Sequence, residues 1–274
     1  MNKIPNPWEA RCPMRSSNTF RKTDAQSPRV AVRPWAIAFW LILWQIAAMA
    51  VGRDFLLASP VTVLLRLWEL VRTAAFWSAA LHSAARILLG FLLGALAGGV
   101  CAGLSLKWRR VRELIAPLHA VLRAIPVASF VIVALIWVPS RNLSVLISFL
   151  IVFPLVYAGS LSELERTDPQ LLEMARLLRM KPLRRLIYLY LRPALPALAN
   201  LCATAMGMAW KSGVAAELIS IPAGSIGERL YKAKVYLMTG ELFAWTLAII
   251  LLSAICARLL RLALLCLAAR LERM

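Results

Sequence analysis

Three charged side chains lie in or beside long apolar runs, and these residues are best placed to act on a solute. Arg123 lies in the run 114–138, Lys211 lies in the run 193–216, and Glu217 follows that run directly. A charge at the centre of a membrane helix costs roughly 2.5–3.5 kcal/mol on insertion scales, so each should face protein or water. One interpretation is an anion path lined by Lys211, Glu217 and Arg123. The other is a structural ion pair, in which Glu217 meets Lys211 or a cation of another subunit.

Residues that would support catalysis or metal binding are missing from the sequence patterns. The segment GMAWKSG (207–213) has a lysine–serine pair, but its spacing differs from that of a phosphate-binding loop. His82 and His119 are isolated, and the five cysteines have no metal-ligand spacing. No nucleophile–base or paired-carboxylate set stands out in the apolar runs. We therefore expect no catalytic residue, no metal and no cofactor in this chain, and we do not expect an enzyme.

The composition predicts an all-α polytopic membrane protein. Of the 274 residues, 61% are hydrophobic and only 16% are charged. Several apolar runs reach the length of about 18 or more residues that a membrane helix needs. The third run contains Pro117 and Pro126, which should interrupt its helix. We predict about six transmembrane helices over residues 34–51, 82–106, 114–138, 143–162, 193–216 and 242–267.

Basic residues predict how these helices are oriented. The net charge is +19, and Lys and Arg are concentrated in the tail 1–33, in the segment 107–113, in the loop 163–192 and near the C-terminus. Cytoplasmic segments of membrane proteins carry such an excess, so the charge needs no nucleic-acid partner. We predict a cytoplasmic basic tail (1–33), a transmembrane domain (34–267) with a cytoplasmic loop (163–192), and a cytoplasmic C-terminus (268–274). Both termini are thus expected in the cytoplasm.

Three further segments have local patterns. Gly90, Gly94 and Gly98 step by four and should form one small-residue face for a neighbouring helix. Residues 59–77 are amphipathic and should lie in the outer membrane–water interface, in contact with lipid. Residues 221–243 contain turn residues and a short mixed helix. This segment is either a re-entrant element near a gate or a surface loop.

The longest polar gap contains a well-started amphipathic helix, TDPQLLEMARLLRMKP (167–182). Asp168 can cap it, Pro169 suits its first position, and Pro182 stops its continuation. Such a helix can dock into a groove of a partner protein or rest on lipid headgroups. Its helically spaced apolar face and flanking charges are Leu171, Leu172, Ala175 and Leu178, with Glu173, Arg176 and Arg179.

Residues 173–196 resemble the EAA loop found in permease subunits of bacterial ABC importers. Glu173 and Ala175 match the start of that loop, and Arg179 stands where the family has glycine. Glycine tolerates a left-handed turn far better than arginine does. The segments that resemble the nitrate/sulfonate/taurine branch of the family are SPVTVL (59–64), LHSAARILLGFLLGALAGG (81–99), LHAVLRAIPVASF (118–130) and GMAWKSGVAAELI (207–219).

This resemblance covers roughly residues 34–265 and implies a function. It implies a permease subunit in the bacterial inner membrane that works as a homodimer with a cytoplasmic ABC ATPase dimer, which binds the ATP. An extracytoplasmic solute-binding protein would deliver a small anion such as a sulfonate, taurine or nitrate. The helix with Leu171, Leu172, Glu173, Ala175, Arg176, Leu178 and Arg179 would then couple the permease to the ATPase. There are two alternatives. One is the same class of transporter with a pyrimidine vitamin precursor as its substrate, and the other is a secondary transporter without an ATPase.

Overall fold

The computed structural model describes residues 34–52 and 56–272, and within these ranges the only regular elements are helices. The chain divides into two units, residues 1–41 and 42–274. Helix α1 (Pro34–Val51) crosses the boundary between them, and the predicted basic tail lies outside the described residues. The further elements, all in the second unit, are α2 (Pro60–Val71), α3 (Ala74–Lys107), α4 (Arg109–Ala124), α5 (Val127–Ala134), α6 (Ser140–Glu165), α7 (Pro169–Leu177), α8 (Pro182–Arg185), the π-helical turn η1 (Leu186–Leu191), α9 (Arg192–Ser220), α10 (Ile226–Val235) and α11 (Thr239–Glu272).

The helix lengths confirm the all-α polytopic class. Five described helices are long and apolar enough to cross a membrane, and α4 with α5 makes a sixth span if this bent pair is counted as one. Each predicted run coincides with one of them, although α3, α6, α9 and α11 extend beyond the predicted ends. Helix α3, for example, begins at Ala74 rather than near His82, because the hydroxyl of Thr73 caps it by accepting a hydrogen bond from Phe76 N–H (3.3 Å).

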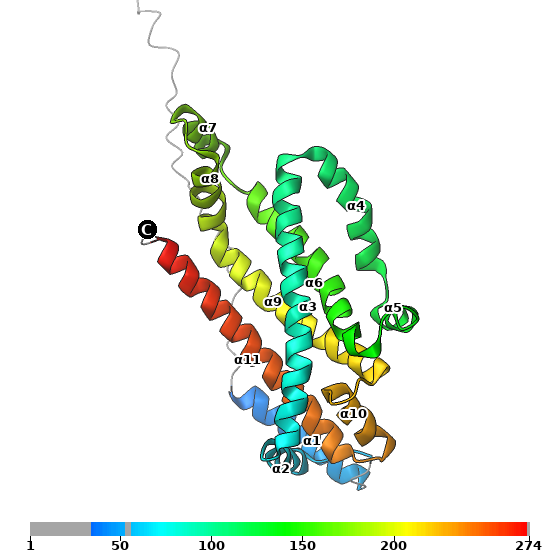
Figure 1. Ribbon diagram of the computed structural model, residues 1–274. Coiled ribbons are helices and arrows are strands. Elements are labelled where there is room, and N and C mark those ends of the chain that lie inside the picture. Colours follow the sequence, from blue (N-terminus) through cyan, green and yellow to red (C-terminus); the bar gives the residue numbers. More distant parts are fainter. Residues whose placement is uncertain (1–33, 53–55, 273–274) are drawn as a thin grey trace, which may run out of the picture. The chain divides into compact units, whose positions relative to one another are not determined.

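Helices α3, α6, α9 and α11 form the centre of the second unit (Figure 1). The glycines of α3 lie against α6, as their spacing predicts. A Cβ atom added at Gly98 would come within 2.8 Å of the Phe153 carbonyl oxygen, and one added at Gly94 would lie 3.0 Å from the Phe149 carbonyl oxygen. Only residues without a Cβ allow the two backbones to come this close. The small-residue face is therefore a helix-packing surface.

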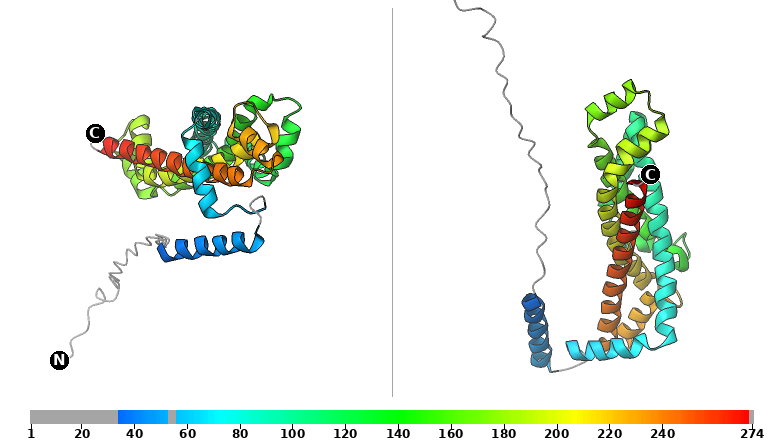
Figure 2. Two further views of the ribbon diagram at one scale, coloured as in Figure 1. Left: turned by 90° about the horizontal axis from the view of Figure 1, so that it is seen from below. Right: turned by 90° about the vertical axis from the view of Figure 1, so that its left-hand side faces the viewer.

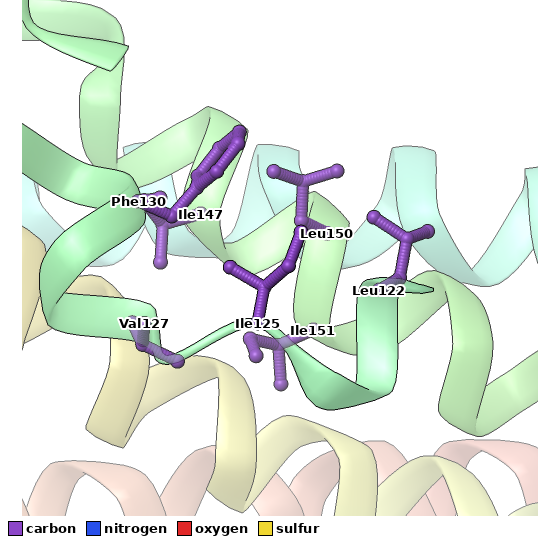
Figure 3. Close-up of a pocket in the computed structure, with 7 residues that line it drawn as sticks. All are labelled: Leu122, Ile125, Val127, Phe130, Ile147, Leu150 and Ile151. Atoms are coloured by element: carbon purple, nitrogen blue, oxygen red, sulfur yellow. The ribbon is translucent and has the colours of Figure 1, made fainter. Parts of the chain in front are cut away.

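The third predicted span is broken once, at Pro126. Helices α4 and α5 meet there at a bend of 101°, and Ile125 has an extended backbone, as expected for a residue before proline. The expected interruption at Pro117 is wrong, because this proline lies inside a continuous α4. The bend leaves a small apolar hollow against α6, which Figure 3 shows, lined by Leu122, Ile125, Val127, Phe130, Ile147, Leu150 and Ile151.

The second unit has two distinct ends. Helices α7 and α8 and the turn between α3 and α4 lie at one end, and the C-terminus of α11 points toward it (Figures 1 and 2). Helices α2 and α10 lie at the other end. Val131 and Leu143, which flank the α5–α6 turn, pack with Ala216 near the α10 end of α9. The chain thus passes from the α7 end toward the α10 end through α4 and α5.

Helix α2 lies across the end of the unit rather than along it (Figure 2, right). Ser59 caps it by accepting a hydrogen bond from Thr62 N–H (3.2 Å), and an ion pair links Arg66 to Glu69 on its polar stripe. A helix that lies along a membrane surface has this orientation and this division of its faces. Its exposed apolar stripe consists of Val61, Leu64, Leu65 and Trp68.

Candidate functional site

Helix α7 is built as its sequence predicts, including its unusual end. Asp168 accepts a hydrogen bond from the N–H of Gln170 (2.9 Å), and Pro169 is the first helical residue. At the other end, Met180 N–H donates to the carbonyl of Ala175 (3.1 Å). Arg179 has a φ of +49°, which is the left-handed conformation that closes a helix in this way. The position where the family pattern has glycine is therefore a left-handed position that arginine occupies here.

The exposed face of α7 differs in part from the predicted one. Leu178 is 67% exposed and Leu171 is also exposed, as the spacing predicts. Leu177, at 85%, and Met174 are exposed as well, but the predicted apolar face did not include them. Ala175 is only 2% exposed, so this member of the predicted apolar face is buried rather than open to a partner.

The remaining predicted residues of α7 divide between its surface and its interior side. Leu172 is half-buried, whereas the charged residues Glu173 and Arg179 are exposed. The side chain of Arg176 lies outside what the structure describes. The exposed face that α7 offers to a partner is therefore formed by Leu171, Met174, Leu177 and Leu178, with Glu173 and Arg179 as its charges.

Helix α7 is followed by the short connection 178–181 and then by helical elements that run into the transmembrane helix α9. Helix α8 leads into η1, and η1 continues directly into α9. The guanidinium of Arg192, at this junction, lies 4.1 Å from the ring centre of Tyr188. Short π-helical turns inside longer helices are frequently found at functional sites. From Pro182 onward the connection to α9 is helical, whereas residues 178–181 separate it from α7.

Helix α9 carries an exposed stripe with polar members in the middle of an apolar span. Lys211 lies on this stripe, and no hydrogen bond or ion pair of Lys211 is found among the described residues. Polar groups facing hydrocarbon are costly, so this stripe is suited to face water or another protein surface. Its members, spaced three or four residues apart, are Asn200, Thr204, Met208, Lys211, Ala215 and Leu218.

Glu217 lies elsewhere, at the centre of a buried polar cluster. Its side chain is fully buried, and its Oε2 accepts a hydrogen bond from the hydroxyl of Ser83 in α3 (2.6 Å). Nη1 of Arg86, also in α3, lies 3.9 Å from Oε1 of Glu217. The suggested pairing of Glu217 with Lys211 is therefore wrong, and a side chain without exposed surface lines no path in this structure.

Arg123 lies apart from both of these groups. It is exposed in the last turn of α4, three residues before the break at Pro126. No contact joins it to Lys211 or Glu217 in the part of the chain that the structure describes. The three charged residues singled out from the sequence thus occupy three different environments, and only Lys211 lies on a polar stripe within a span.

Comparison with known proteins identifies the family. The model of the family described as "binding-protein-dependent transport system inner membrane component" matches residues 87–273, which is more than half of the chain. The chain belongs to this family. This membership agrees with the resemblance in the sequence and with the polytopic helical fold. It makes the chain the membrane component of a transport system that also includes a binding protein and an ATPase.

Among the individual relatives, two are named for sulfonate or taurine transport and one for riboflavin transport. A Bacillus subtilis protein named for aliphatic sulfonates transport, the permease protein SsuC, is 30% identical over 210 residues, covering 74% of each chain. The taurine transport system permease protein TauC of Escherichia coli is 28% identical over 212 residues, covering 74% of this chain and 76% of TauC. The riboflavin transport system permease protein RibX of Chloroflexus aurantiacus is 26% identical over 196 residues, covering 71% and 72%.

Proposed function

We propose that this permease conducts a small anion, such as a sulfonate, taurine or nitrate, across the inner membrane. The observation that carries this proposal is the polar stripe on α9, in which Lys211 is the one charged member. A lysine within a span that has no hydrogen bond or ion pair among the described residues favours an anionic solute. The names of relatives such as SsuC and TauC support the same substrate class.

Two copies of the chain form the path in this proposal. Each copy has one exposed α9 stripe and one α7, so a pair supplies two facing stripes and two docking helices. The exposed leucines of α7 fit an apolar groove on a cytoplasmic ATPase dimer, with Glu173 and Arg179 beside it. ATP is bound by that partner, and this chain supplies no catalytic residue.

The orientation follows from charge. The α7 end of the second unit carries the basic segments 107–113 and 163–192, so it faces the cytoplasm. The α10 end faces outward and receives the solute from the binding protein, while lipid headgroups contact α2. A secondary transporter is disfavoured because the described spans carry carboxylates only near their helix ends, and the one in α9, Glu217, is buried and paired with Arg86.

Purification of the tagged chain from its native membrane in mild detergent tests this proposal. Mass spectrometry should identify a stoichiometric ATPase with a phosphate-binding loop. The binding protein that co-purifies or acts with the complex should then bind sulfonates, taurine or nitrate in calorimetric titrations. A chain that is folded yet reproducibly alone would contradict the ATPase partnership. A binding protein selective for a neutral vitamin precursor would contradict the anion.

A further inference from the structure

Helix α10 is attached to the bundle through its first turn. Its N-terminal N–H groups need acceptors from outside the helix. Ser225 caps it locally by accepting from Glu228 N–H (3.0 Å). The other two partners come from distant helices, because Ile226 N–H donates to the Ser83 hydroxyl (2.9 Å) and Gly227 N–H donates to Glu217 Oε2 (3.4 Å). One carboxylate thus holds α3, α9 and α10 together.

The attachment is buried and depends on the charge of Glu217. Ser83, Glu217 and Ser225 are all fully buried. The carboxylate lies at the positive end of the α10 dipole and near the guanidinium of Arg86. Removing it would leave Arg86 without its counter-charge and two N–H groups of α10 without their network. Buried groups that lose a partner in this way are strongly destabilising.

The backbones of α9 and α10 also meet without room for a side chain. A Cβ atom added at Gly227 would lie 2.5 Å from the Cβ of Glu217 and 2.6 Å from the backbone nitrogen of Leu218. Those two atoms belong to α9 and include backbone, so they cannot move aside without moving the helix. The close contact gives a second, purely steric way to disturb the same attachment.

The connection between α9 and α10 opposes this attachment. Ile221, the residue after α9, is left-handed with φ +46° and ψ +54°, and Gly224 has φ +72°. A β-branched residue is strained in this conformation. Strained residues persist when the surrounding contacts hold them, and they are concentrated at switch regions. Release of α10 would allow Ile221 to leave this conformation, whereas the Glu217 cluster holds the helix in place.

We infer that Glu217 is a positioning residue that anchors α10 against α9 and α3, and that release of this anchor opens the outer end of the path. Helix α10 lies opposite the ATPase-facing α7, at the end to which the α9 stripe leads (Figure 1). The anchor itself is independent of the proposed function. Its role in opening rests on that function, because only a coupled transporter links the outer end to ATP hydrolysis.

Limited trypsin digestion of the full chain tests the anchor. Helix α10 contains the exposed residues Lys232 and Lys234, whose peptide bonds are cut only when the helix opens. Glu217→Ala and Gly227→Ala should each raise the rate of these cuts by about ten-fold, since proteolysis follows the population of the opened form. The rate of cutting after Arg110, at the opposite end, should stay unchanged. Gly99→Ala is the matched control, because a Cβ atom there meets nothing within 4 Å.

The outcomes separate the possibilities. Wild-type rates in both variants, or equal acceleration after Arg110, would overturn the anchor. If Glu217→Ala does not fold, Ser83→Ala and Gly227→Ala decide by the same criterion.

For the opening step, Glu217→Gln should raise ATP hydrolysis without binding protein several-fold in the reconstituted complex. If α10 is released but the rate of ATP hydrolysis is unchanged, the opening role is overturned. If no ATPase partner exists, the proposed function is overturned, and the digestion still decides whether Glu217 anchors α10.

Discussion

Arg179 shows a residue whose backbone conformation was foreseeable although its side chain is unusual. The family pattern has glycine there, and the structure gives this residue a φ of +49°. A non-glycine residue pays about 1–2 kcal/mol for that conformation. Arginine is retained nonetheless, with its exposed side chain beside the apolar face of α7.

Replacing Arg179 with glycine should therefore strengthen the end of α7. The relief of strain exceeds the added chain entropy of glycine, leaving a gain of about 0.5–1 kcal/mol. Amide hydrogen exchange of the last turn of α7 should slow about two- to five-fold. Arg184→Gly, beyond the left-handed position, serves as a control and should not slow it. Faster exchange in Arg179→Gly would show that the arginine side chain stabilises the turn.

Lys211 is the residue whose charge bears most directly on the proposed anion transport. Lys211→Met keeps a long side chain on the α9 stripe but removes the charge, so uptake of an anion should fall at least ten-fold. This fall corresponds to an activation free energy that is higher by about 1.4 kcal/mol. Lys211→Arg keeps the charge and should retain most of the uptake. Uptake assays in reconstituted vesicles measure both, with co-purification of the ATPase as a check on assembly. Normal uptake by Lys211→Met would remove Lys211 from the path.

Other side-chain environments could not be read from the sequence. Glu217 and Arg86 lie in different helices, and nothing in a linear pattern indicates that they meet 3.9 Å apart. The burial of Ala175 likewise depends on how α7 folds back on its own chain. Helical spacing places residues on one face, but it does not say which face turns inward.

At the scale of elements, α7 is the part of the fold that is proposed to contact the ATPase. Replacing Leu177 and Leu178 together with glutamate should abolish co-purification of the ATPase, because charges would enter an apolar groove. Replacing the same two residues with methionine conserves volume and should preserve the complex. Quantitative mass spectrometry of the purified complexes measures the ratio. An ATPase that stays bound to the glutamate variant would favour the alternative in which α7 rests on lipid.

Helices α3 and α6 provide a second test, through two adjacent glycines with opposite surroundings. Gly98→Ala places a Cβ 2.8 Å from the Phe153 carbonyl oxygen, so it should lower the free energy of unfolding by about 1–3 kcal/mol. Gly99→Ala meets nothing within 4 Å and should change it by less than about 0.5 kcal/mol. Thermal unfolding in detergent compares the two variants. Equal stability of both would show that α3 and α6 can separate without cost.

Elements were more predictable than contacts. Long apolar runs predicted each span, because a membrane helix must form all its backbone hydrogen bonds internally over a length set by the bilayer. Pro126 broke the third span as expected, whereas Pro117 did not, since a single proline can be accommodated inside a helix. The π-helical turn Leu186–Leu191 had no signal, because its register depends on packing around α9 rather than on residue type.

For the whole molecule, the distribution of charge and the path of the chain lead to one topology. The basic segments 107–113 and 163–192 lie at one end of the second unit, and the C-terminus of α11 points the same way (Figure 1). Charge counting and three-dimensional arrangement are separate observations, because the first uses only composition. Their agreement depends on α4 and α5 crossing the membrane together despite their bend of 101°.

That crossing has a direct consequence for two exposed arginines. Arg110 is the second residue of α4 and Arg141 is the second residue of α6, so a single broken span places them on opposite sides of the membrane. A membrane-impermeant maleimide should label Arg141→Cys in whole cells with a permeabilised outer membrane, and Arg110→Cys only in inside-out vesicles. The unmodified chain, with its own cysteines, gives the background. Labelling of both from the same side would mean that α4 and α5 form a re-entrant loop. The described chain would then have five spans, and the segments 107–113 and 163–192 would no longer share the cytoplasmic side that docking of α7 requires.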